Sequence, residues 1–433
     1  MPALPFEASE PDSLMGAIMA LEGIEDAVVL LNGPTGCKTL YGWISGLQYP
    51  RADQLDPARY HQEFYFGQAR VPTTYLDEQD YIFGGSEKLA RIFAAIAAED
   101  HGLIGIVNSP GAALIGDDLQ RFLAEAQPRV PTIAIETPGF SASMTAAHQQ
   151  ALRAAIAAID PPVRRPDPHC VNLLGTSIYQ RHWQGNLAGL RELLAAMGIR
   201  VGAALGAGCS VAEIRSLRAA RHNVVLQREY ADTLGPWVEE CYGVPTIFPA
   251  AGAPIGFEAT EQWLREVAAA LGCDPAPALR LVEQARRIAF RHLYRFHHQT
   301  GLPKGATFAV RAEASTVAPL VRWLHGYLGM VPVAIQISGG AGGPHAADAR
   351  SYLRTIGCEE AWEAAWDAEP SDLVLANGPI VASLVADGLA AAGIELSMPA
   401  TEHIDVLPKA LLGSNGALFL LERILNQLRD RVW

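Results

Sequence analysis

The feature that most constrains the fold is a series of short, continuously apolar runs separated by amphipathic stretches with helical periodicity. Such runs predict strands buried on both faces, as in parallel sheets covered by helices. We therefore expect an α/β fold. Its strands are predicted at Ala27–Leu31, Glu63–Phe66, Leu103–Val107, Thr132–Ile135, Val171–Leu174, Val201–Ala204, Val224–Gln227, Ala306–Val310, Val333–Ile337, Leu373–Ala376 and Ile394–Leu396.

Two breaks divide this series. The stretch Ile159–Cys170 is rich in proline and charge and is typical of a linker. The second break, His297–Ala306, ends a long helical region, Glu261–Gln299, which is itself interrupted near Asp274. Since 433 residues are too many for one ordinary core, we predict three Rossmann-like domains at 1–164, 165–300 and 301–433. The last should end in a helix, Ala417–Arg431.

The turns after the strands are the places to look for function, because ligands of open α/β sheets bind beyond the carboxyl ends of the strands. Three domains facing one another predict a deep central cleft lined by such turns. The turns concerned are Asn32–Thr39, Asn108–Gly116, Glu136–Ser143, Arg228–Leu234, Ser338–His345 and Asn377–Ile380.

Composition excludes several classes of protein. A net charge of −13 argues against a nucleic-acid partner. No apolar run reaches about 18 residues, so we expect no membrane span, and the N-terminal stretch carries no export signal. The six cysteines include no C-x-x-C pair, which argues against a disulfide framework or a zinc ribbon. A reducing cytoplasm fits best.

The turn after the first strand superficially resembles a P-loop. In G-x-x-x-x-G-K-[ST], glycines would stand where this chain has Asn32 and Cys37, so we expect no ATP site here. Small Gly36 and cationic Lys38 flank Cys37, an arrangement that favours a thiolate and suits a metal ligand or a reactive thiol. The alternative is a small apolar residue that fills the turn.

Five segments together resemble the nitrogenase component 1 superfamily along nearly the whole chain. They are NGPTGCKTLYG (Asn32–Gly42), DEQDYIFGGSEKL (Asp77–Leu89), NSPGAALIGDDL (Asn108–Leu119), ETPGFSAS (Glu136–Ser143) and LGSNGALFLLERI (Leu412–Ile424). The resemblance implies three α/β domains in a two-chain oxidoreductase complex. An iron–sulfur cluster lies between the paired subunits of such a complex. A separate ATP-hydrolysing iron protein supplies electrons for transfer to a substrate or metallocluster.

The resemblance makes Cys37 the metal ligand, with Gly36 and Ser109 as further cluster contacts. The family places two more cysteines where this chain has none, in Gln68–Leu76 and at Ser109-Pro110. A [4Fe-4S] cluster needs about four ligands, so the cluster would be shared. The expected assembly is an α2β2 heterotetramer in which this chain is the one-ligand, β-type subunit, paired with a related α-type subunit.

The residues that would hold a large cofactor in an α-type chain are not matched. Gln227 stands where a cysteine is expected, and His403 is out of register. The resemblance therefore implies a reductase whose substrate, a methylthio-alkane C–S bond or a tetrapyrrole, is reduced on the partner chain. No catalytic residue is assigned here. The alternatives are the partner chain of a metallocluster assembly scaffold, without turnover, and a homodimer that uses two Cys37 thiolates and perhaps Ser109.

Several other candidates are weaker. Of Asp117 and Asp118, we expect one to cap the helix that starts near Leu119 rather than form an acid pair. Cys209 either faces the cleft or has no role. We expect His292, His297 and His298 to be solvated. The strand-end loop Ile337–His345 could line a cofactor. We expect Arg311 and Glu313 to point into the cleft as contacts for an anionic substrate.

Overall fold

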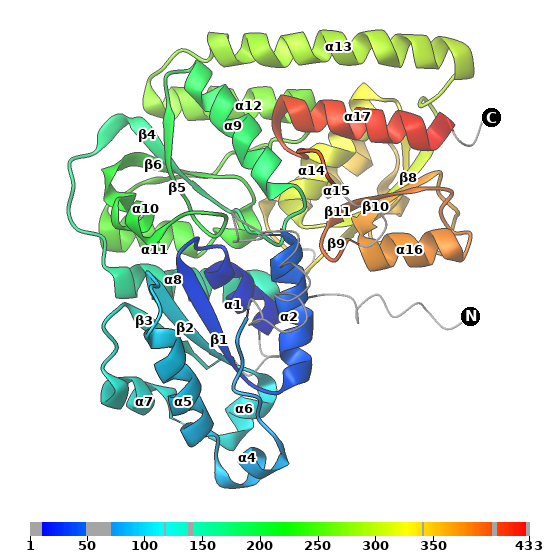
Figure 1. Ribbon diagram of the computed structural model, residues 1–433. Coiled ribbons are helices and arrows are strands. Elements are labelled where there is room, and N and C mark those ends of the chain that lie inside the picture. Colours follow the sequence, from blue (N-terminus) through cyan, green and yellow to red (C-terminus); the bar gives the residue numbers. More distant parts are fainter. Residues whose placement is uncertain are drawn as a thin grey trace.

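The computed structural model describes residues 11–48, 71–116, 118–136, 142–339, 342–400 and 405–429. The chain is an α/β protein built on three parallel sheets, each flanked by helices (Figure 1). This architecture confirms the predicted fold class.

The first sheet has the order β1-β2-β3. Every residue of β1 (Ala27–Asn32) and β2 (Leu103–Asn108) is buried, whereas β3 (Thr132–Ile135) alternates between buried and partly exposed positions. The helices of this part are α1 (Ser13–Glu22), α2 (Thr35–Gln48), α4 (Glu78–Phe83), α5 (Ser86–Ala97), α6 (Pro110–Ile115), α7 (Leu119–Ala126) and α8 (Met144–Ile159).

The second sheet has the order β5-β4-β6-β7. Its strands are β4 (Asp167–Leu174), β5 (Arg200–Ala204), β6 (Ala220–Val225) and β7 (Thr246–Ile247). The accompanying helices are α9 (Trp183–Ala196), α10 (Val211–Arg215), α11 (Leu234–Tyr242), α12 (Gly256–Leu271) and α13 (Ala276–Thr300), with short 3-10 turns η2 (Leu217–Ala219) and η3 (Arg228–Tyr230).

The third sheet has the order β11-β10-β8-β9. Its strands are β8 (Thr307–Ala312), β9 (Val331–Ile337), β10 (Leu373–Asn377) and β11 (Gly393–Ser397), and its helices are α14 (Ala314–Arg322), α15 (Pro344–Thr355), α16 (Gly378–Ala386) and α17 (Gly413–Arg429), with short turns η4 (Trp323–Tyr327) and η5 (Glu359–Ala361). The last helix, α17, packs against α9, α12 and α13, so the chain returns to its middle part (Figure 1).

Most predicted strands coincide with observed ones, with four differences. The two-residue β7 was missed, because so short a run carries no periodicity. Strand β6 starts at Ala220 and ends at Val225, earlier than predicted. The expected strand Glu63–Phe66 lies outside the described residues. Strand β4 begins at Asp167, so the last four residues of the expected linker are already strand.

Other local predictions can be checked directly. Asp118 caps α7, because its carboxylate accepts a hydrogen bond from the Arg121 amide at 2.9 Å, and this confirms the capping interpretation. Asp117 and His403 lie outside the described residues. The histidines of α13 are solvent-exposed as expected. The terminal helix starts at Gly413, four residues before the predicted start. Domain boundaries near 164 and 300 remain a prediction.

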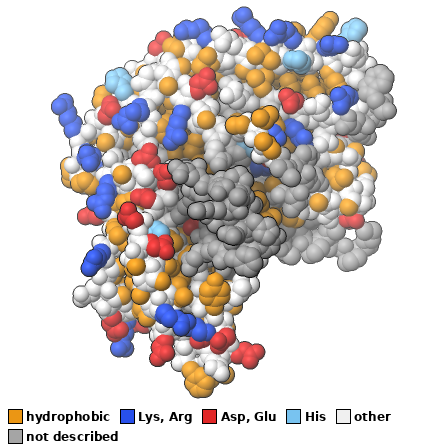
Figure 2. Space-filling model, viewed as in Figure 1, with side chains coloured by type: hydrophobic (Ala, Val, Ile, Leu, Met, Phe, Trp, Pro, Cys, Tyr) orange, Lys and Arg blue, Asp and Glu red, His pale blue; other side chains and the backbone are white. Residues whose placement is uncertain are grey.

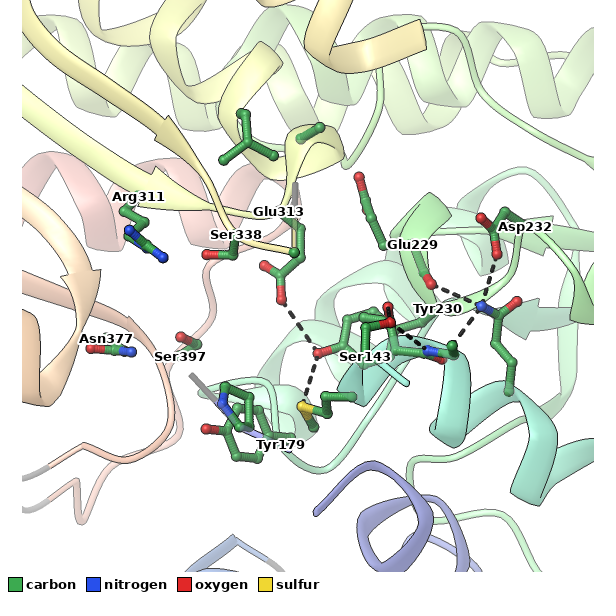
Figure 3. A pocket seen from close by; sticks show the side chains of 18 of the residues that line it. Ser143, Tyr179, Glu229, Tyr230, Asp232, Arg311, Glu313, Ser338, Asn377 and Ser397 are labelled. Carbon is green, nitrogen blue, oxygen red and sulfur yellow. Dashed lines mark hydrogen bonds between the residues drawn. The ribbon is translucent and has the colours of Figure 1, made fainter. Parts of the chain in front are cut away.

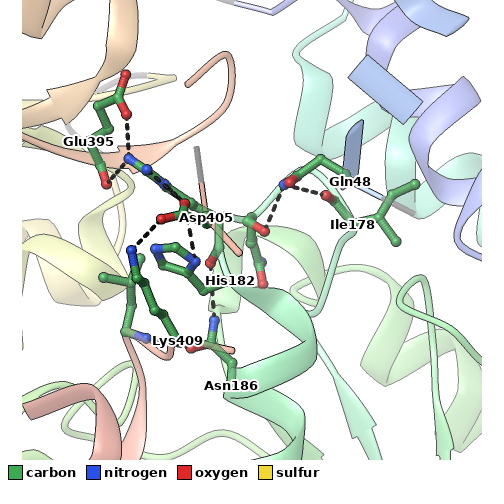
Figure 4. Close-up of polar contacts among 10 residues, drawn as sticks. Gln48, Ile178, His182, Asn186, Glu395, Asp405 and Lys409 are labelled. Carbon is green, nitrogen blue, oxygen red and sulfur yellow. Dashed lines mark hydrogen bonds and ion pairs between the residues drawn. The ribbon is translucent and has the colours of Figure 1, made fainter. Parts of the chain in front are cut away.

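A buried ion network joins the second and third sheets (Figure 4). The Arg181 guanidinium contacts the Glu395 carboxylate and lies 2.8 Å from that of Asp405. Gln48, at the end of α2, donates to the carbonyl oxygens of Ile178 and Gln180 at 2.9 and 3.1 Å. The loop that carries Arg181 is thus held by all three parts of the chain. Within the described residues, no helix is both long and apolar enough to cross a membrane.

Candidate functional site

Cys37 lies in the first turn of α2, directly after β1. Its side chain is partly buried and packs on the main hydrophobic core, whereas Gly36 faces open space. Because β1 and β2 pair in parallel with Asn32 opposite Asn108, the turns that follow the two strands lie side by side. The Ser109 amide donates to the Asn32 carbonyl oxygen at 2.9 Å, which fixes the two turns together.

Ser109 stands beside this turn but is only 1% exposed. It caps α6, with its hydroxyl oxygen accepting from the Ala112 amide at 3.2 Å. A Cβ atom on Gly33 would lie 2.6 Å from the Ser109 hydroxyl oxygen, so this approach requires glycine. The structure therefore brings Cys37 and Ser109 together. A cluster-binding role for Ser109 stays a prediction, and such a role would compete with its capping bond.

The surroundings of Cys37 disfavour the thiolate, whereas the sequence had suggested that they would favour it. Burial, and then the Asp12 carboxylate, raise the pKa of the Cys37 thiol. The sequence had suggested thiolate stabilisation by Lys38, whose side chain is outside the described part. Since a bound metal itself deprotonates a coordinating thiol, Cys37 would become a thiolate through iron binding and not through these neighbours.

Tyr81, on α4, completes the surroundings of the turn. Burial and the neighbouring Cys37 raise the pKa of the Tyr81 phenol, and a hydrogen bond with Ser109 lowers it. A Cβ atom on Gly111 would lie 2.7 Å from the Tyr81 hydroxyl oxygen, so α4 and α6 meet closely here. Three segments that are distant in sequence therefore meet around Cys37.

Exposed apolar side chains surround this site. On α2, α4 and α6 they are Leu40, Trp43, Leu47, Ile82, Phe83 and Leu114. Phe83 is 84% exposed and Leu114 89% exposed. Figure 2 shows hydrophobic side chains at the lower end of the molecule, where α4 lies in Figure 1. Apolar patches of this kind mark interaction surfaces.

A cavity of about 510 Å³ lies where the three sheets meet, which confirms the predicted central cleft (Figure 3). The third sheet supplies residues at the carboxyl ends of its strands: Arg311 and Glu313 at β8, Ser338 after β9, Asn377 at β10 and Ser397 at β11. The turn after β6, the start of α8, Pro11 and Tyr179 in the loop after β4 supply further parts of the described lining. The expectation that Arg311 and Glu313 face the cleft is confirmed.

The wall formed by the second sheet is acidic. Both carboxylate oxygens of Glu229 accept from Ser315, one from its amide at 2.8 Å and one from its hydroxyl. Asp232 accepts from the Gln149 side-chain amide at 2.8 Å. The Tyr230 hydroxyl donates to Glu313 at 3.3 Å, and burial, with Glu313 adding to it, raises the pKa of this phenol.

The sequence reasoning missed Glu229, Asp232 and Tyr179 as cavity residues. The one signal for Glu229 and Asp232 was position, because Arg228–Leu234 had been marked as a strand-end turn, whereas Tyr179 lies in none of the marked turns. The expectation of an anionic substrate rested on Arg311. In the described lining the carboxylates of Glu229, Asp232 and Glu313 outnumber this cation.

The remaining cysteines do not contribute to either site. Cys209 is 1% exposed, does not line the cavity, and its pKa is raised by burial to about 12. It packs in the core, and its carbonyl oxygen accepts from the Glu25 amide at 2.8 Å. Among the described residues, no cluster of three or more His, Cys, Asp or Glu side chains could bind a metal ion. A metal-ligand role for Cys37 stays a prediction.

Known proteins resemble the chain in sequence. It is 29% identical over 265 residues to the nitrogenase iron-molybdenum cofactor biosynthesis protein NifE of Methanococcus maripaludis, covering 59% of this chain and 51% of that protein. It is 27% identical over 231 residues to the nitrogenase molybdenum-iron protein alpha chain of Methanothermobacter marburgensis, covering 51% and 47% of the two chains.

A shorter stretch of this chain is more similar to a third known protein. It is 42% identical over 113 residues to one of the subunits of the light-independent protochlorophyllide reductase of Rhodospirillum rubrum, covering 26% of this chain and 20% of that protein. The matches to these curated relatives thus span about half of their length or less.

The fold is shared over nearly the whole chain. The solved structure described as nitrogenase Cp1 at pH 6.5 superimposes with a TM-score of 0.73, covering 98% of this chain and 93% of that one at 16% identity. The model of the nitrogenase component 1 type oxidoreductases matches residues 13–429. The chain therefore belongs to the nitrogenase component 1 type oxidoreductase family.

Proposed function

We propose that the chain is the β-type subunit of a nitrogenase-like reductase complex. In this proposal Cys37 supplies one ligand to an interface [4Fe-4S] cluster. A related α-type subunit supplies the others within an α2β2 assembly in the cytoplasm. An ATP-hydrolysing iron protein delivers electrons, and the partner chain carries the methylthio-alkane or tetrapyrrole reduction.

The observation that carries the proposal is the isolation of Cys37. It is a cysteine in a strand-end turn, partly accessible, with open space at Gly36 and an apolar surface on the helices around it. One thiolate cannot hold a cubane cluster. A ligand at the edge of an apolar, exposed surface fits a cluster completed by a second chain.

The residues at the turn fit such a group. Cys37 would hold the iron, and Gly36 leaves the approach open because a Cβ atom at this position would have no neighbour within 4 Å. The bound cluster would supply one-electron transfer. The chain's own contribution is to keep Cys37 rigid, since its turn is tied to β2 through Asn32 and Asn108, whose side chains bond at 2.9 Å.

The second candidate is the partner chain of a metallocluster assembly scaffold that turns over no substrate. The similarity to NifE, whose name gives a role in cofactor biosynthesis, favours it. A scaffold hands on its cluster, whereas a reductase retains its cluster through repeated cycles. Iron transfer from the loaded complex to an apo-acceptor protein, measured against substrate turnover, separates the two.

The test of the main proposal is Cys37→Ala in the complex purified with its partner. We expect loss of the interface cluster signal in the EPR spectrum and a matching fall in iron content. Cys241→Ala is the matched control, because Cys241 is an exposed cysteine on α11. An unchanged cluster signal in the Cys37 variant would contradict the proposal. A homodimer would instead give a complex of about twice the 46.4 kDa chain mass in native mass spectrometry.

A further inference from the structure

The long helix α13 concentrates positive charge in an acidic chain. The chain as a whole has a net charge of −13. One side of α13 packs against α9, α12 and α17, and the helix lies at the opposite end of the molecule from α4 and α6 (Figure 1). It contains a single carboxylate, that of Glu283, and these arginines: Arg280, Arg286, Arg287, Arg291 and Arg295. The helix therefore forms a basic edge far from the Cys37 turn.

Three of the arginines form a row on the solvent side of α13. Arg287, Arg291 and Arg295 are all exposed and follow one another at four-residue spacing, which places successive Cβ atoms about 5–6 Å apart on one face of a helix. Arg287 pairs with Glu283 at 3.0 Å. Within the described part of the chain, no carboxylate pairs with Arg291 or Arg295. The row thus presents positive charge that the chain itself does not neutralise.

A second row, of rings, runs beside the arginines. Phe290 and Tyr294 are stacked with their centroids 6.0 Å apart, and Tyr294 lies 6.3 Å from the ring of His298. All three side chains are exposed. The rings also follow one another at four-residue spacing, so the two rows are parallel. Arginine and aromatic residues are enriched in protein interfaces and among the residues that contribute most to binding.

A groove of about 800 Å³ lies along this helix beside Tyr327 of η4. Ile288 and Phe290 contribute apolar surface to it, and Arg287 and Arg291 also line it. An apolar side chain that enters the groove is covered by these residues while its neighbours remain next to the arginine row. The groove therefore suits a partner that carries apolar and anionic groups together.

The charge of the rest of the chain decides which anionic partner fits. A nucleic acid or a membrane surface extends beyond one helix, so it would also meet the field of a chain with a net charge of −13. A flat lipid surface would also leave the groove unfilled. An acidic helix of a protein covers α13 alone. Its carboxylates at four-residue spacing match the arginine row, and an apolar stripe beside them matches the rings.

We propose that α13 is a docking site for an acidic amphipathic helix of a partner protein. Its carboxylates pair with Arg287, Arg291 and Arg295. Its apolar stripe covers Phe290 and Tyr294 and places one side chain in the groove. The contact rests on one helix, so the complex is weak and reversible. This docking site does not depend on the cluster role of Cys37.

The test measures the binding of synthetic peptides to the full chain, as purified, by fluorescence anisotropy. The probe is a labelled helical peptide with one row of glutamates at four-residue spacing and a neighbouring row of leucines. A second peptide has the same composition but distributes the glutamates around the helix, and a third has glutamine in place of every glutamate. We expect the first peptide to bind at least about tenfold more tightly than either of the others, a difference of about 1.4 kcal/mol.

Two variants assign the two rows. The triple substitution Arg287→Gln, Arg291→Gln and Arg295→Gln should weaken binding of the first peptide by at least about tenfold. It should also remove most of the salt dependence of binding, because salt screens exposed charges. The double substitution Phe290→Ser and Tyr294→Ser should weaken binding but keep the salt dependence. All five side chains are exposed, so the variants should fold, which circular dichroism checks.

The matched control replaces three exposed arginines outside α13 with glutamine, at Arg91, Arg121 and Arg129. It changes the net charge of the chain equally and should bind the first peptide as the parent does. Equal loss in this control would overturn the proposal, because the effect would then follow total charge and not the row on α13.

Three further results would overturn the proposal. The first is a parent chain that does not bind the first peptide more tightly than the other two. The second is tighter binding to phosphatidylglycerol vesicles or to duplex DNA than to that peptide. The third is a parent chain whose self-association, seen in native mass spectrometry, is lost in the arginine variant, because a second copy would then cover α13. None of these readouts uses iron or turnover, so they are independent of the outcome at Cys37.

Discussion

The Cys37 turn and the central cavity are built in opposite ways. The turn combines one partly buried thiol, that of Cys37, with exposed apolar residues on α2, α4 and α6, and the described structure has no group of three or more His, Cys, Asp or Glu side chains that could bind a metal ion. The described lining of the cavity comes from strand ends, loops and the start of α8 in one chain, and Arg311 and Asp232 are hydrogen-bonded to neighbours in the same chain. In our proposal the first is half of an interface, whereas the second is a pocket formed within one chain.

This difference indicates which of the two regions is stable without a partner chain. A pocket whose polar groups are satisfied internally is stable without a partner, because its charges are already paired or hydrogen-bonded. An apolar surface around a single ligand gains stability only when a second surface covers it. Substitutions near the cavity should therefore affect folding, whereas substitutions near Cys37 should affect association.

The largest expected effect is from Arg181→Ala, in the network beside the cavity. This change leaves the buried Glu395 carboxylate without its cation, and breaking a buried pair in this way costs about 3–5 kcal/mol. Urea denaturation measures the loss of unfolding free energy. Arg121→Ala, which breaks an exposed pair with Glu125, is the control and should leave the unfolding free energy nearly unchanged. Equal losses in the two variants would remove the distinction.

The next largest effect is a loss of unfolding free energy in acid, which we assign to His148. Burial lowers the pKa of His148 from 6.5 to about 3, and among the described residues neither ring nitrogen has a hydrogen-bond partner. The unfolded chain therefore binds the extra proton between these values, so stability falls as the pH drops below about 6.5. The loss is about 2 kcal/mol at about pH 5.

His148→Gln, which has no imidazole to protonate, tests this assignment. Its unfolding free energy should depend less steeply on pH than that of the parent in that window, as measured by denaturant unfolding at a series of pH values. His292→Gln, on the exposed face of α13, should keep the slope of the parent. Parallel curves for the parent and His148→Gln would disprove the assignment to His148.

A smaller effect on folding is expected at the surface around Cys37. Because Phe83 and Leu114 are 84% and 89% exposed, the double change to serine should alter unfolding free energy by less than about 0.5 kcal/mol. Association with the partner subunit should weaken by about tenfold or more, as measured by surface plasmon resonance. Val163→Ser, at a residue 77% exposed in the segment between α8 and β4, should leave association unchanged.

The last prediction concerns the reactivity of the Cys37 thiol and involves the smallest change in stability. The raised pKa of Cys37 means that little thiolate is present at neutral pH without metal. Alkylation by iodoacetamide should therefore accelerate by about tenfold per pH unit below that pKa, as followed by mass spectrometry. Cys209, buried and with a pKa of about 12, should stay unmodified in the folded chain. A rate at Cys37 that does not change with pH would show that its thiol is already ionised.

Much of this organisation could be predicted from sequence. The apolar runs indicated the strands, because residues buried on both faces of a parallel sheet leave a continuous pattern. The rule that ligands bind beyond the carboxyl ends of strands led to the turn of Cys37 and to Arg311 and Glu313. Asp118 was predictable as a cap because the capping bond is local.

Long-range contacts were not predictable in the same way. The acidic wall made by Glu229 and Asp232 carries no motif, and its residues enter the cavity only because the second sheet faces the third. Burial, and after it the Asp12 carboxylate 25 residues earlier in the sequence, raise the pKa of Cys37, against the expectation drawn from Lys38. Packing brought these groups together.

The sequence by itself determined most of the strands and the α/β class with parallel sheets, because hydrophobic periodicity is a property of consecutive residues. Only the tertiary structure decided that Ser109 lies buried against Gly33, that Cys37 is partly desolvated, and that Arg311 shares one cavity with Glu229, Asp232 and Glu313. These properties depend on distances between residues far apart in the chain, and burial and Coulomb energy follow those distances.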